Sequence, residues 1–123
     1  MTATLVLPAR QPLHEVWGYL AEVTAALRIG LESCTVDHDR PVSAYVALDE
    51  RLPHYPGSDV ALLWDEIHGW AAAIENHCSE DLTVLRYLGG NTATPAPAQV
   101  ARFIAALHEN DDGVGQLAPP SLP

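Results

Sequence analysis

The stretch VALLWDEIHGWAAAIE, residues 60–75, decides how this chain folds. Two apolar runs, residues 60–65 and 70–75, flank a short segment that ends in His68 and Gly69. Glycine adopts a positive φ freely and histidine tolerates one better than most residues, so this pair resembles the Asn-Gly type of two-residue hairpin turn. We therefore expect two antiparallel strands. Because both faces of residues 60–65 are apolar, that strand is predicted to be central and covered on both sides.

The register of this hairpin stays open at the level of sequence. A two-residue turn at His68-Gly69 pairs Ile67 with Trp70, whereas a five-residue loop pairs Trp64 with Trp70. A shift of one residue exchanges the two faces of a strand. The sequence therefore predicts the hairpin without saying which side chains face the core.

Three further strands are predicted around this hairpin. Apolar and polar residues alternate in residues 31–37 and 42–48, which is typical of strands with one buried face. Residues 38–41 form a turn between these two strands, because they combine charged residues with a proline. A fifth strand at residues 82–88 ends at Gly89-Gly90.

Helical periodicity flanks the strands on both sides. From Pro12 to Gly30 the apolar residues recur at spacings of four, three and four: Val16, Leu20, Val23 and Leu27. A second helix is predicted after Thr92 or Thr94, either of which suits a helix N-cap, with Pro95 and Pro97 in the first turn. Its apolar stripe consists of Val100, Phe103, Ile104 and Leu107.

The element order helix, five strands, helix predicts an α+β fold. We expect an antiparallel sheet of about five strands joined as hairpins, with both helices packed on one face. A single domain is predicted at residues 12–108, after an N-terminal arm at residues 1–11. Residues 109–123 are acidic and then rich in glycine and proline, so a disordered tail is expected there.

Composition excludes several classes of function. The 123 residues contain 16 acidic and 6 basic residues, all six of them arginines, for a formal net charge of −10. General binding of nucleic acid or of an anionic membrane needs clustered lysine and arginine, so neither is expected. Two cysteines are too few for a disulfide framework, and no apolar run approaches 18 residues. We therefore expect a cytoplasmic protein with reduced thiols. The absence of lysine also suits a GC-rich genome.

Several segments carry a resemblance to a known family. They are GLESCTVD (residues 30–37), AYVALD (44–49), DVALLWDE (59–66), HGWA (68–71), YLGG (87–90) and VARF (100–103). Together they resemble a family of small actinobacterial proteins that is catalogued only as a domain of unknown function. The likeness runs from about Val16 to Leu107. It implies no activity and no catalytic residues.

The sequence motifs give little support for a metal site or for a catalytic site. Cys34, His38, His77 and Cys78 could supply four zinc ligands, but their spacing is not that of paired zinc ligands, and Cys34 alternates in phase with Val36 as a core residue does. No nucleophile elbow accompanies these residues. The carboxylate pairs at residues 49–50, 65–66, 80–81 and 111–112 lie in or beside predicted turns. We expect no metal and no cofactor, and the sequence favours a protein that is not an enzyme.

Aromatic residues and His77 provide the candidate binding positions: Tyr45, Trp64, Trp70, His77 and Tyr87. Core packing is the favoured role of Trp64, and an exposed contact is the alternative. Since two helices cover one face of a five-stranded sheet, the other face is expected to be apolar and to mark an interface. We predict an acidic, homodimeric interaction module that engages a protein partner through this open face or an edge strand, and its acidic surface favours a basic partner. The alternative is a small-molecule-binding or enzymatic domain. Its pocket would lie between sheet and helices, lined by Tyr45, Trp64, Trp70 and His77.

Overall fold

Five antiparallel strands form one sheet in the order β1-β2-β3-β4-β5, so each strand pairs with its neighbour in the chain. This computed structural model describes residues 13–76, 81–109 and 113–122. The strands are β1 (Cys34–Asp37), β2 (Ser43–Leu48), β3 (Val60–Asp65), β4 (Gly69–Glu75) and β5 (Leu82–Tyr87). Helix α1 (Leu13–Ala26) and the short 3-10 helix η1 (Leu31–Ser33) precede the sheet, and helix α2 (Pro97–His108) follows it. The predicted α+β fold is confirmed.

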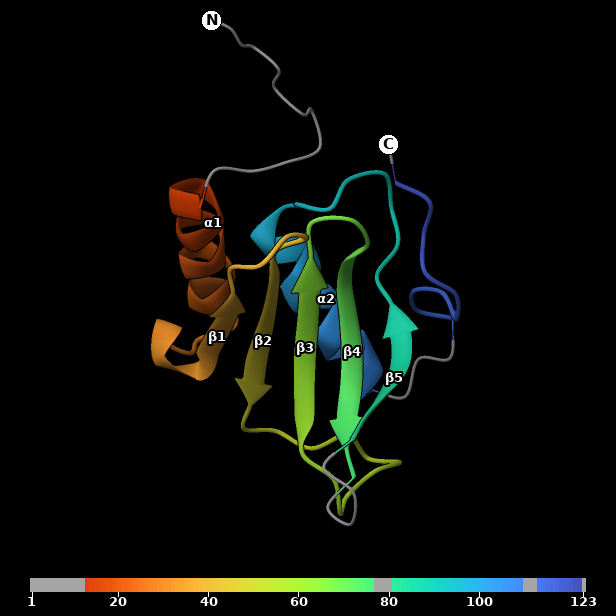
Figure 1. The fold of residues 1–123 in the computed structure, drawn as a ribbon. Coiled ribbons are helices and arrows are strands. Elements are labelled where there is room, and N and C mark those ends of the chain that lie inside the picture. Colours follow the sequence, from red (N-terminus) through yellow and green to blue (C-terminus); the bar gives the residue numbers. More distant parts are fainter. Residues whose placement is uncertain (1–12, 77–80, 110–112, 123) are drawn as a thin grey trace, which may run out of the picture.

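Both helices pack on the same face of the sheet, and α2 runs behind β3 and β4 in Figure 1. Their apolar stripes meet alternate residues of the strands in one buried cluster. It contains Val16, Leu20, Val23, Val42, Ala44, Val46, Leu62, Trp64, Trp70, Ala72, Val100 and Phe103. The described helices thus leave the opposite face of the sheet, turned toward the viewer in Figure 1, without a helical cover.

The central hairpin pairs Trp64 with Trp70, one of the two registers that the sequence left open. Its loop consists of residues 66–68, and Gly69 follows with a φ of +75°. The backbone N–H groups of Ile67 and His68 both donate to Asp65 Oδ1, at 2.8 and 2.6 Å. This Asp-centred turn begins earlier than a two-residue turn at His68-Gly69, which is the alternative that the observed register excludes.

Helix α1 ends four residues before the predicted stop at Gly30, because Arg28 takes the left-handed conformation with a φ of +63°. The N–H of Ile29 donates to the carbonyl of Thr24, and the N–H of Arg28 donates to that of Ala25. These two bonds form a Schellman motif, a common helix ending in which glycine is the usual left-handed residue.

Helix α2 begins at Pro97, and Ala96 precedes it without a side-chain cap. The prediction that Thr92 or Thr94 caps this helix was wrong. The hydroxyl of Thr92 instead accepts the backbone N–H of Thr94 within the preceding loop. No described helix is both long enough and apolar enough to cross a membrane.

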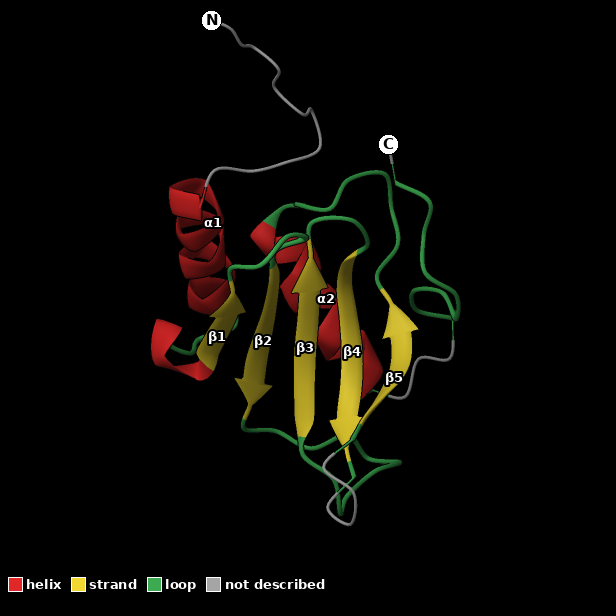
Figure 2. Cartoon of the chain, in the orientation of Figure 1, coloured by secondary structure: helices red, strands yellow, loops and turns green. Residues whose placement is uncertain are grey.

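Part of the C-terminal segment lies against the sheet. Gln116 and Tyr87 exchange two backbone hydrogen bonds, at 2.7 and 2.8 Å, so residue 116 extends the edge at β5 (Figure 2). Val114 packs against the main core. Residues 113–117 therefore contact the sheet, at an edge that offers free backbone partners. The disordered tail expected at residues 109–123 stays a prediction. The arm expected at residues 1–11 lies outside the described residues.

Candidate interaction face

The face of the sheet turned away from the helices, here called the open face, is apolar in its centre. One row across it consists of Thr35, Tyr45, Leu63, Ala71 and Tyr87, and the next of Ala47, Ala61, Ala73 and Val84. Ala61 and Ala73 are fully buried beneath their larger neighbours, whereas Val84 is 38% exposed. The open face therefore presents large apolar side chains around a floor of alanine methyl groups.

A groove of about 590 Å³ crosses the open face, mainly over β1, β2 and β3, and is also lined by His38 in the β1–β2 turn and by Leu82 at the start of β5. Tyr45 and Leu63 contribute apolar surface to it, and Asp37 and Asp65 contribute carboxylates. No arginine lines it among the residues that the structure describes. The groove is thus apolar along its length and negative at one end.

The far end of the open face is acidic as well. The Tyr45 hydroxyl donates a short hydrogen bond to the carboxylate of Glu75, which lies close to Asp59 at the start of β3. Burial raises the pKa of Tyr45 to about 12, and the hydrogen bond and negative charge of Glu75 and the charge of Asp59 add to this effect. Arg51 pairs with Asp59 at 3.1 Å, in an exposed contact. Carboxylates therefore flank the apolar centre at both ends.

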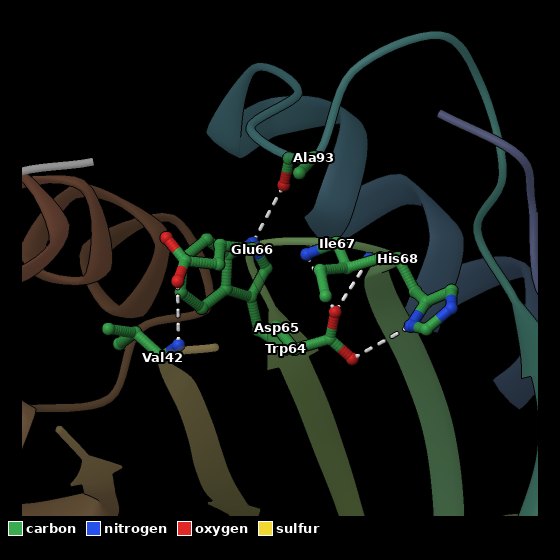
Figure 3. Close-up of polar contacts among 7 residues, drawn as sticks. All are labelled: Val42, Trp64, Asp65, Glu66, Ile67, His68 and Ala93. Carbon is green, nitrogen blue, oxygen red and sulfur yellow. Dashed lines mark hydrogen bonds and ion pairs between the residues drawn. The ribbon is translucent and has the colours of Figure 1, made fainter. Parts of the chain in front are cut away.

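The two tryptophans lie on the opposite, helix-covered face. Trp64 and Trp70 are 2% and 1% exposed, and their ring centroids are 6.5 Å apart. The Trp70 indole N–H donates to the Tyr19 hydroxyl, which in turn donates to the carbonyl of Pro95. The Trp64 N–H donates to the carbonyl of Ala93 at 2.7 Å (Figure 3). Trp64 therefore binds the loop before α2 directly, and Trp70 binds it through Tyr19. Neither indole is accessible to a partner.

The candidate binding residues that the sequence suggested do not form one site in the structure. Tyr45 and Tyr87 lie on the open face, whereas Trp64 and Trp70 fill the space where we expected an aromatic pocket between sheet and helices. His77, with Cys78, lies outside the described residues. The chain's own sequence did not identify Leu63, Val84 and Glu75 as members of the face. Their alternation with core residues was visible, but only the hairpin register assigns them a side.

A family model matches residues 19–106 of the 123, from within α1 to the last turns of α2. The chain belongs to DUF6292, a family of unknown function. The match covers all five strands, and so it covers the whole open face. Comparisons with curated proteins and with solved structures find no match.

A polar cluster at the β3–β4 hairpin of this DUF6292 member contains the groups most suggestive of catalysis. Asp65 Oδ2 lies 3.3 Å from His68 Nδ1 (Figure 3), and Ser43 pairs with Asp65 across β2 and β3. A serine triad needs the histidine between the acid and the nucleophile. Here the aspartate lies between the other two, and its second oxygen already accepts two backbone N–H groups. The cluster is therefore built as a turn rather than as a proton relay.

Cys34 and His38, two of the four residues considered as zinc ligands, lie in different surroundings. Cys34 packs against the core, where burial raises the pKa of its thiol and disfavours the thiolate that binds metals. The His38 ring lies 6.2 Å from that of Trp17. Within residues 13–76, 81–109 and 113–122, no three His, Cys, Asp or Glu side chains are grouped to hold a metal ion.

Proposed function

We propose that this protein is a non-catalytic binding module whose open face takes up a protein segment with apolar side chains flanked by basic ones. The groove over β1, β2 and β3 carries the proposal, because it combines Tyr45 and Leu63 with carboxylates and contains no described arginine. Apolar contact supplies binding free energy in such an interface, and complementary charge supplies specificity and association rate.

The charge pattern favours a basic partner over the second copy that we expected from the sequence. Asp37 and Asp65 lie at one end of the open face, and Glu75 lies at the other, beside Asp59, whose charge is partly offset by Arg51. Two copies packed face to face place carboxylates against carboxylates in either relative strand direction. Like charges brought together in an interface oppose association.

Fluorescence anisotropy with two labelled peptides tests this proposal. In one peptide leucine and tyrosine alternate with arginine, and in the other glutamate replaces each arginine. We expect the arginine peptide to bind, to bind more weakly as salt is added, and to outcompete the glutamate peptide. Asp37→Asn keeps the side-chain oxygen that accepts the N–H of Asp39 and removes the charge, so it should weaken binding about twofold to fivefold.

The matched control is Glu22→Gln, which removes one charge from the exposed side of α1, on the other layer of the fold. It should leave binding of the arginine peptide unchanged. Equal binding of both peptides, or of neither, would contradict the proposal. A dimer in sedimentation equilibrium that Leu63→Arg converts to a monomer would assign the open face to a second copy instead.

We also propose a cytoplasmic location and an actinobacterial source. Both rest on composition: two cysteines suit a reducing compartment, and the absence of lysine suits a GC-rich genome.

A further inference from the structure

A second cavity, of about 260 Å³, opens between the helices and the sheet at the end away from the β3–β4 loop. Residues 27–29, which follow α1, line it together with the end of β2, the segment after β2, the start of β3 and the last turns of α2. Sites for drug-sized molecules typically measure about 300 to 1,000 Å³. This cavity therefore suits a smaller molecule, and it is separate from the open face.

The inner wall of the cavity is apolar. Leu52 and Val60, which are 5% and 2% exposed, form its depth together with Leu48 and Ile104. Branched aliphatic side chains on all sides favour an aliphatic group as the occupant.

Four polar side chains line the cavity as well: Arg28, Asp49, Glu50 and His108. Two of them contact each other, since His108 Nε2 lies 3.6 Å from Glu50 Oε2. The other two groups, Arg28 and Asp49, line the same cavity and form no ion pair with another described side chain. The cavity thus combines one cationic and one anionic side chain that have no partner among the described side chains with an apolar interior.

Arg28 is the left-handed residue at the end of α1. Its φ of +63° lies in the left-handed region, which a long side chain occupies at a cost and glycine occupies freely. Arg28 nevertheless lines the cavity with an exposed, cationic side chain at a position where glycine is the usual residue.

We propose that this cavity binds a free α-amino acid with an aliphatic side chain. The α-carboxylate pairs with Arg28, the α-ammonium pairs with Asp49, and the side chain enters between Leu52, Val60 and Ile104. A zwitterion matches the two unpaired charges at once, whereas a simple fatty acid or amine leaves one of them unmatched. Charge-assisted hydrogen bonds to both groups orient the amino acid in the site.

Thermal unfolding and calorimetric titration of the full chain test the assignment with three compounds of the same aliphatic skeleton. L-leucine carries both charges, 4-methylpentanoate lacks the ammonium group, and 3-methylbutylamine lacks the carboxylate. At about 100 times its Kd, L-leucine should raise Tm by roughly 10 °C. Each compound that lacks one charge should bind about tenfold more weakly.

Two variants test whether Arg28 and Asp49 bind L-leucine. Arg28→Asn removes the charge and keeps a residue that tolerates the left-handed region, so the fold is retained. Arg28→Asn and Asp49→Asn should each weaken L-leucine binding about tenfold. Arg102→Gln, on the exposed side of α2, and Asp37→Asn, on the open face, should leave it unchanged.

The proposal is overturned if L-leucine gives neither a Tm shift nor binding heat. It is equally overturned if L-leucine and 4-methylpentanoate bind alike, or if Arg28→Asn and Asp49→Asn bind L-leucine as the natural chain does.

Discussion

The carboxylate of Glu66 accepts a hydrogen bond from the backbone N–H of Val42 at 2.9 Å (Figure 3), and it is almost completely buried. The same carboxylate pairs with the Arg40 guanidinium at 2.9 and 3.1 Å. In return, the backbone N–H of Glu66 donates to the carbonyl of Val42. These contacts hold the β1–β2 turn against the β3–β4 loop, which fixes the acidic end of the groove.

Replacement of Glu66 should therefore destabilise the fold. Glu66→Ala leaves the buried N–H of Val42 without its acceptor and removes the partner of Arg40, so we expect a loss of about 2 to 3 kcal/mol. Glu66→Gln keeps one acceptor oxygen and should lose about 1 kcal/mol. Urea denaturation measures both changes. Glu22→Ala, an exposed position on α1, should stay within about 0.5 kcal/mol, and an equal loss there would refute this role.

Most of the fold followed from local sequence patterns. Alternation and helical periodicity identified all five strands and both long helices, since these patterns reflect which side of an element is buried. Element ends were less predictable. Arg28 in the left-handed region ended α1 early, and Asp65 started the hairpin turn early, because both depend on a single residue's local bonds.

The candidate site was less predictable than the fold. The face of a strand residue depends on register, and the register of the central hairpin follows from the Asp65 turn rather than from the apolar pattern. Tyr45 and Tyr87 were identified as candidates by residue type, whereas Leu63 needed the register. The cavity beside Arg28 combines residues from five separate elements and loops, so no local pattern reveals it.

Tyr19→Phe tests how much the bonds between helix α1 and the tryptophans contribute. The Tyr19 hydroxyl accepts from Trp70 at 2.9 Å and donates to Pro95 at 2.7 Å. Its removal leaves the indole N–H of a buried tryptophan unpaired, so a loss of about 1 to 3 kcal/mol is expected in thermal or urea unfolding. Tyr55→Phe, at an exposed tyrosine, should lose less than about 0.5 kcal/mol. Similar losses in both variants would contradict the assigned role.

Stability should fall at alkaline pH because of two tyrosines. Burial raises the pKa of Tyr19 to about 12, and burial together with Glu75 raises that of Tyr45 to about 12, from a value of 10.0 for each. Between these values the unfolded chain has lost protons that the folded chain retains, so the free energy of unfolding decreases as pH rises. Their contribution is fully present below pH 10. Urea midpoints measured across this range should show the decrease, and it should be shallower in Tyr19→Phe and in Tyr45→Phe. The same slope in a variant that lacks both hydroxyls would refute the assignment.

Arg28→Gly should stabilise the protein, although it deletes a long side chain. Glycine adopts the φ of +63° without the steric cost that arginine bears, and part of this gain is offset because glycine gives the unfolded chain more freedom. We expect a net increase of about 0.5 to 1 kcal/mol in the free energy of unfolding, measured by urea denaturation without added amino acids. The same substitution in the interior of α2, Arg102→Gly, should have the opposite sign and lose about 1 kcal/mol, because glycine weakens a helix interior. A loss of stability in Arg28→Gly would mean that the guanidinium contributes more to the folded state than its strained backbone costs. That result would argue for a structural role of Arg28 in place of a binding one.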